Sequence, residues 1–299
     1  MYTYAWYHWI TFFFIYCFCG WIFESTYVSL KKKRYVNRGF LRLPMLPLYG
    51  SGAVMMLWVS LPVQDNLALV YVFGVIGATV LEYVTGYGME QLFKVRYWDY
   101  SNQKFNINGY ICLSSSLAWG FLTILMTQVL HKPVERFVLA LSPALEFSFI
   151  GIVGALFLAD TIQSTREALS LARALEAITK IRGELDELQL QIALLKAETA
   201  QVVDELKATQ RLKVSRYKNA KLQQATAFKD RAIKRLPVRL EIPVLTKQLH
   251  SLSEKQQQLA SHLNFYRRGI LRGNPGATSR HFAAALRELK EAAEHYKNK

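Results

Sequence analysis

The sequence predicts an all-α protein: a polytopic membrane bundle of about five transmembrane helices, followed by a long cytoplasmic coiled-coil and helical tail. Three observations support this class. Long apolar runs fill the first 160 residues, short basic clusters separate several of these runs, and apolar residues adopt a 3-4 spacing from Leu171 onward. Residues 1–160 hold 11 Lys and Arg against 8 Asp and Glu, whereas the remainder holds 26 against 14. We therefore expect a membrane domain and a basic tail.

The membrane domain is predicted from run length, because a helix needs about 20 apolar residues to cross the hydrocarbon core. Five stretches meet or approach that length, at 5–30, 44–62, 67–93, 112–130 and 137–160. The first is too long for a signal peptide and has no Lys or Arg before Lys31. We expect it to remain as the first span.

The orientation is predicted from the loops between spans, because basic residues are retained on the cytoplasmic side. Six Lys and Arg crowd residues 31–42, none lies at 64–66, three lie at 94–104, and only Lys132 and Arg136 lie in the fourth loop. This alternation predicts an N-terminus outside and a tail in the cytoplasm.

Four glutamates lie inside the predicted spans, where charge is costly and is expected to face protein or water. They are Glu24, Glu82, Glu90 and Glu146. On the third span, small residues and acids recur every fourth position, which predicts one stripe that packs against a neighbouring helix. Its members are Gly74, Ala78, Glu82, Gly86 and Glu90. We expect Glu24 to pair with Arg38 and Glu90 with Arg96, either to clamp the bundle or to line a pathway.

Two loop motifs carry a family resemblance. The first loop contains Arg38-Gly39-Phe40-Leu41, and the second contains Trp98-Asp99-Tyr100-Ser101, then Asn106 and Gly109 before Cys112-Leu113. Together with the span glutamates, residues 10–155 resemble the CmpB-type ABC-transporter permease family of bacterial membrane proteins. The resemblance implies a permease-like integral membrane subunit. It also implies a substrate pathway or binding site, made of Glu24, Arg38, Glu82, Glu90, Arg96, Asp99 and Asn106.

The sequence suggests what else such a subunit would need. It has no Gly-x-x-x-x-Gly-Lys-Ser/Thr phosphate loop, so under the permease reading a separate ATPase subunit must supply energy. The three cysteines, Cys17, Cys19 and Cys112, lie in or beside apolar segments, and the six histidines show no metal-ligand spacing. We expect no cofactor, no metal and no catalytic residues.

The tail is predicted as a coiled-coil stalk over 161–236 and a helical tail over 237–299. Apolar residues follow a 3-4 spacing from Leu171 to Leu206, and a second such series begins at Leu245, after Pro237 and Pro243. The tail therefore could fold back as a hairpin, and the seam could close within one chain or with a second chain or partner. Residues 207–239 contain eleven Lys and Arg and a single acid. This excess of positive charge suggests either an anionic partner or a solvent-exposed helix face.

Three functions are compatible with this layout. A permease-like subunit is favoured by the motif loops and the acidic stripe. A membrane-anchored coiled-coil scaffold is the first alternative. An intramembrane enzyme acting on lipid or envelope intermediates, with Glu82 or Glu90 as base and Arg38 or Arg96 holding a phosphate, is the second. It is the least favoured of the three, because no hydrolase triad or metal motif accompanies it.

Overall fold

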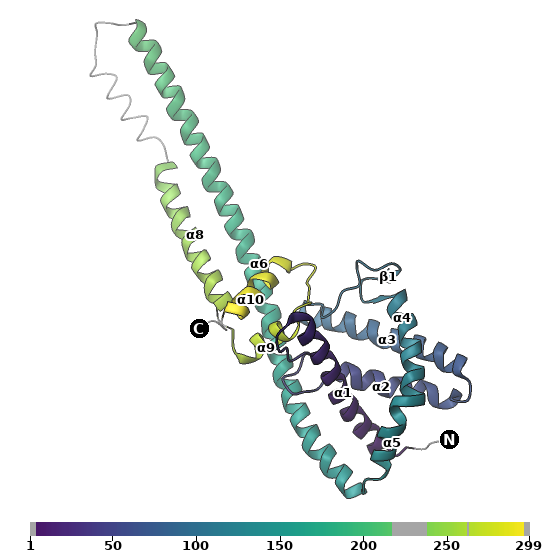
Figure 1. Ribbon diagram of the computed structural model, residues 1–299. Coiled ribbons are helices and arrows are strands. Elements are labelled where there is room, and N and C mark those ends of the chain that lie inside the picture. Colours follow the sequence, from purple (N-terminus) through teal and green to yellow (C-terminus); the bar gives the residue numbers. More distant parts are fainter. Residues whose placement is uncertain (1–3, 217–237, 262, 296–299) are drawn as a thin grey trace. The chain divides into compact units, whose positions relative to one another are not determined.

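The protein is almost entirely helical. The computed structural model describes residues 4–216, 238–261 and 263–295. In this part of the chain, the only strands form a two-stranded antiparallel ribbon, β1 (Asn106–Ile107) and β2 (Ile111–Cys112), and the other regular elements are helices (Figure 1). The predicted all-α class is confirmed.

The chain divides into two compact units, which we describe separately. The first comprises Met1–Leu175 together with Leu263–Lys299, and the second comprises Glu176–His262. The first unit holds all of the apolar helices and every candidate site residue.

Four helices of the described chain are long and apolar enough to cross a membrane. They are α1 (Trp6–Lys32), α3 (Leu67–Phe93), the continuous helix Leu113–Leu139 and the first part of α6 (Pro143–Arg216). A fifth apolar helix, α2 (Pro47–Ser60) with a 3₁₀ turn to Val63, is shorter. It begins later than the predicted span at 44–62, because Leu46 keeps an extended backbone and Pro47 is preorganised for the first helical position. The chain is therefore a membrane protein.

The end of the fourth apolar segment differs from the prediction. Helix α4 (Leu113–Leu125) continues through a π-helical stretch (Met126–Leu130) into α5 (His131–Leu139), where the sequence predicted a loop after Leu130. The π turn lies just before Pro133, whose missing N–H would interrupt a regular α ladder. The chain reverses only at residues 140–142, and α6 begins at Pro143 instead of Phe137.

The predicted stripe on α3 is the buried face of that helix. Gly74, Ala78, Glu82 and Gly86 are buried, and Glu90 is half-buried. A Cβ atom placed on Gly74 would lie 2.3 Å from Oγ1 of Thr123, so glycine lets α3 and α4 approach closely. Many large apolar side chains of these helices are exposed, as expected for helices that face lipid.

We predict that Gly74→Val destabilises the first unit, because the added methyl groups would overlap Thr123 across the α3–α4 contact. The expected cost is about 1–3 kcal/mol. Thermal unfolding of the purified chain in detergent measures it. Gly88→Val on the same helix is the control, since nothing lies within 4 Å of a Cβ there. Equal unfolding temperatures for the two variants would contradict the close approach.

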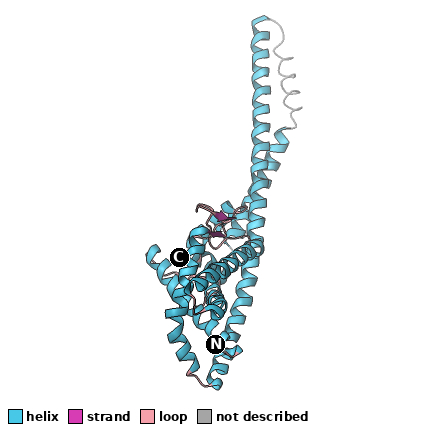
Figure 2. Ribbon diagram, turned by 90° about the vertical axis from the view of Figure 1, so that its right-hand side faces the viewer, coloured by secondary structure: helices cyan, strands magenta, loops and turns pink. Residues whose placement is uncertain are grey.

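The second unit consists of the distal part of α6 and of α8 (Val238–Ser261), which lie side by side in both views (Figures 1 and 2). In the apolar 3-4 series of α6, Ile178, Ile181 and Ile192 are buried. Leu185 and Leu188, which lie between them in the series, are half-buried. The predicted apolar positions of α8 are half-buried as well. The coiled coil and the number of chains in it stay predictions.

The basic segment at 207–239 lies mostly outside the described residues, so its anionic partner stays a prediction. The sequence predicted a helical tail over 237–299, with a loop near residues 269–276 before a last short helix. In the structure, the residues from Leu263 onward group with the membrane helices instead of with α8. They form α9 (Phe265–Gly273) and α10 (Ala283–His295).

Candidate functional site

Glu82 is a buried carboxylate on α3 whose hydrogen bonds come from two other segments. Tyr100 of the following loop donates its hydroxyl to Oε1 at 3.0 Å, and Trp119 of α4 donates its indole N–H to Oε2 at 2.8 Å. Only 6% of the glutamate is exposed. The acid therefore faces protein, as predicted, and it joins two helices and a loop through neutral donors.

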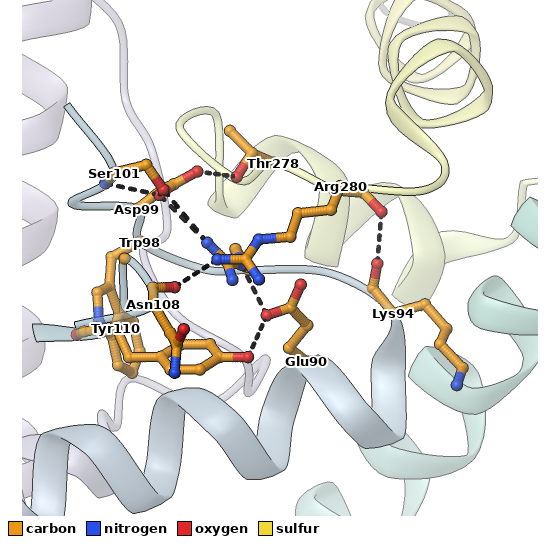
Figure 3. Close-up of polar contacts among 12 residues, drawn as sticks. Glu90, Lys94, Trp98, Asp99, Ser101, Asn108, Tyr110, Thr278 and Arg280 are labelled. Carbon is orange, nitrogen blue, oxygen red and sulfur yellow. Dashed lines mark hydrogen bonds and ion pairs between the residues drawn. The ribbon is translucent and has the colours of Figure 1, made fainter. Parts of the chain in front are cut away.

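Glu90, two turns further along α3, forms the predicted pair with Arg96. The arginine Nε lies 2.6 Å from Oε2. The Tyr110 hydroxyl donates to the same oxygen at 2.5 Å (Figure 3). The guanidinium carbon also lies 4.7 Å from the centre of the Tyr110 ring. We call Glu90, Arg96 and Tyr110 the second-loop cluster.

Asp99 fixes the same arginine from the other side. Its Oδ1 accepts the backbone N–H and the hydroxyl of Ser101, and it lies 3.4 Å from Nη1 of Arg96. Its Oδ2 accepts the hydroxyl of Thr278 at 3.1 Å (Figure 3). Burial alone would raise the pKa of Asp99, but these hydrogen bonds and the positive charge of Arg96 outweigh it and lower the pKa below the ordinary aspartate value.

Asn106 shapes the second loop from inside. Its amide donates to the carbonyls of Ser101 and Gln103, and its side-chain oxygen accepts the N–H of Gly109. Gly109 has φ +72°, and a Cβ there would crowd Ser101 and Arg96, so only glycine fits this turn. In this structure, Asn106 therefore acts on the loop and not on an open cavity.

A similar cluster lies under the first loop. The Tyr49 hydroxyl donates to Oε1 of Glu24 at 3.0 Å, and Nε of Arg38 lies 3.7 Å from Oε2 of the same carboxylate. The predicted pair is therefore present, although it is looser than the pair of Glu90. We call Glu24, Arg38 and Tyr49 the first-loop cluster.

The two clusters share one plan. In each, a glycine lies four residues before the glutamate, the glutamate accepts a tyrosine hydroxyl, and an arginine Nε faces the same carboxylate. A Cβ on Gly20 would lie 2.3 Å from Tyr49, and one on Gly86 would lie 3.2 Å from Tyr110. The absence of a side chain at these glycines lets Tyr49 lie against α1 and Tyr110 lie against α3.

Tyr100 lies between Glu82 and the first-loop cluster electrostatically. Burial raises the pKa of its hydroxyl above the ordinary tyrosine value, and the negative charges of Glu82 and then Glu24 raise it further. Glu82 and Glu24 therefore act on the same tyrosine of the second loop.

The C-terminal segment returns to both loops. Nη1 of Arg38 donates to the side-chain oxygen of Asn274 at 2.7 Å, whereas the backbones of Arg96 and Thr278 exchange two hydrogen bonds of 2.8 and 2.9 Å. Only four residues separate the two contacts, so both motif loops lie on the same side of the helix bundle. Nη2 of Arg280 donates a hydrogen bond to the backbone carbonyl of Asn108 at 2.6 Å (Figure 3).

Sequence reasoning missed several residues of this site. Tyr49, Tyr110 and Trp119 give the acids their neutral donors, and Asp160, treated only as the end of a span, accepts the backbone N–H groups of Arg42 and Leu43. Tyr110 lies inside the second motif, directly after Gly109, which was the available signal for it. No pattern pointed to Asn274, Thr278 and Arg280.

Glu146, the fourth span acid, lies apart from these clusters. It is buried on α6, with Oε2 3.5 Å from Nε2 of His8 on α1. Within the described ranges, no three His, Cys, Asp or Glu side chains gather in a way that could hold a metal ion.

The fold and the site define a polytopic membrane protein whose buried acids are joined to two loops on one side of the bundle. Residues 11–165 match the family described as "Putative ABC-transporter type IV", of the CmpB type. The match covers more than half of the 299 residues, so the chain belongs to this family. No curated protein and no solved structure matches the chain. The matched range contains all seven predicted site residues, and the family supports a transporter-like role.

We predict that Asp99→Asn lowers the stability of the first unit by about 1 kcal/mol, the usual worth of such hydrogen bonds. Because the folded pKa is depressed, the carboxylate contributes stability that is present above its ordinary range and is lost as pH falls through the folded pKa. The difference in melting temperature between parent and variant should therefore shrink as the buffer is acidified. Asp65→Asn, at an exposed aspartate between α2 and α3, is the control. A pH-independent difference would contradict this role for the charge.

Proposed function

We propose that the chain is the membrane-embedded, permease-like subunit of an ABC transporter and takes its energy from a separate ATPase subunit. Family membership supports this, and the observation that carries it is the environment of Glu82. A carboxylate buried at membrane depth is costly, so it is kept for a reason that packing alone does not supply. Here it is tied to a loop and to a second helix by Tyr100 and Trp119. A movement of the loop would therefore change the surroundings of the acid.

In this proposal the two motif loops form the working surface, and the substrate pathway runs along the acidic stripe of α3. The contacts of Asn274, Thr278 and Arg280 place the C-terminal segment on this surface. An ATPase subunit would therefore meet the loops together with α9 and α10.

We predict that Glu82→Gln folds, because an amide keeps an acceptor for Tyr100 or Trp119, but that it loses most of the coupled activity. The readout is the stimulation of ATP hydrolysis when the chain is reconstituted with the ATPase subunit that co-purifies from the native membrane. Gln91→Glu, at an exposed position near the end of α3, is the matched control for a change of charge. The proposal fails if no ATPase subunit co-purifies, or if Glu82→Gln retains full stimulation.

The proposal also places the N-terminus outside and both motif loops in the cytoplasm of a bacterial cell. A cysteine introduced in place of Lys33 or of Lys104 should then react with a membrane-impermeant thiol reagent only after the cells are opened. A cysteine at Gln64 should react in intact cells. The parent chain, with its own three cysteines, gives the background. Labelling of Lys33→Cys and Lys104→Cys in intact cells would reverse the proposed orientation.

A scaffold remains the second candidate, and the second unit is the observation that favours it. Helix α6 extends from the membrane domain to Arg216 and packs with α8 in a unit of its own. A scaffold would keep its function if an unrelated membrane anchor replaced residues 1–142. A permease subunit would lose its function.

A further inference from the structure

An arginine-rich pocket of about 270 Å³ lies between the first loop and α9. Residues 34–42 form one wall, and α9 with its C-terminal end forms the other. No aspartate or glutamate lines it. Its four basic lining residues are Arg34, Arg42, Arg268 and Arg272.

Arg42 is the best-defined cation of the pocket. Its guanidinium packs over the Phe265 ring, with 4.2 Å from Cζ to the ring centre, and it lies against Gly269, where a Cβ would displace it. Asp160 accepts the backbone N–H of Arg42, and the buried Nε has no hydrogen-bond partner among the described residues. The Arg42 side chain is thus held in place by its neighbours, while its Nε–H donates no hydrogen bond within the described residues.

Two charges of the pocket, those of Arg42 and Arg272, repel each other. Burial lowers the pKa of Arg42, Asp160 and two nearby tyrosines raise it, and the positive charge of Arg272 lowers it again. Arg34 is held by Glu294 through two short hydrogen bonds. An anion in the pocket would relieve the repulsion between Arg42 and Arg272.

The pocket lies where the first membrane helix ends. Helix α1 finishes with Lys31 and Lys32, and the pocket wall begins two residues later. Tyr35 and Phe265, both lining residues, are 76% and 61% exposed. Exposed aromatic side chains beside a span end are typical of the membrane–water interface.

We propose that this pocket binds the phosphate group of an anionic membrane lipid. An arginine guanidinium can donate two parallel hydrogen bonds to the oxygens of a phosphate. A pocket that no acid lines does not repel such an anion. Basic pockets at the end of a membrane helix are suited to lipid headgroups, because the lipid already holds the phosphate at that level. None of the residues that line this pocket belongs to the basic segment at 207–239.

The test uses the purified full chain in neutral detergent, with phosphatidylglycerol as the anionic probe and phosphatidylcholine as the neutral one. Native mass spectrometry gives the fraction of chains that retain each lipid. Arg272→Gln and Arg42→Gln should each lower phosphatidylglycerol retention about fivefold, from about 1 kcal/mol per basic residue. Arg287→Gln, at an exposed arginine of α10, is the matched control and should retain the parent affinity. Arg42→Lys, which keeps the charge, should recover part of the binding if Arg42→Gln folds poorly.

Competition separates the two sources of a phosphate group. If glycerol phosphate displaces the lipid only at far higher concentration, the lipid headgroup is the ligand. If glycerol phosphate or inorganic phosphate binds as tightly in the absence of lipid, the pocket takes a soluble phosphate and the lipid proposal is overturned. Equal retention of the two lipids, or equal effects of Arg272→Gln and Arg287→Gln, would overturn it as well.

Discussion

The structure depends on the cost of placing carboxylates inside a membrane domain. A buried charge is tolerated only when donors or cations surround it, and each donor must come from a segment that packs against the span. Glu24, Glu82 and Glu90 each recruit a tyrosine hydroxyl, from α2 or from the second loop. The acids therefore specify where the loops lie. A loop that moved away would leave a charge without its hydrogen bond.

The sequence predicted the features that follow from a repeating pattern or from local charge. The four-residue stripe of α3 is buried because small residues and acids at that spacing share one helix face. The pairs Glu24–Arg38 and Glu90–Arg96 were predictable because each arginine lies in the loop that directly follows the span of its glutamate. The tyrosine donors were not predicted, because any of the many aromatic residues could have pointed toward the acids.

The missed features depend on long-range contacts or on an unbroken ladder of hydrogen bonds. The helix Leu113–Leu139 passes through basic residues that resembled a loop, because a π turn accommodates Pro133 without ending the helix. Thr278 pairs with Arg96 across more than 180 residues of sequence, and the heptads of α6 and α8 between them gave no reason to expect it. The resulting segment covers the loops that the family motifs identify.

The two matched clusters also indicate which parts of the chain can change length. Glycine and glutamate keep the same four-residue interval on α1 and α3, whereas 14 residues separate glutamate from arginine in the first loop and 6 in the second. One residue inserted between glycine and glutamate would turn the acid by roughly 100° about the helix axis. It would then face lipid, while an insertion in the connecting loop would leave it in place. Among homologous chains, gaps should therefore accumulate in the connections and be absent from these helical turns.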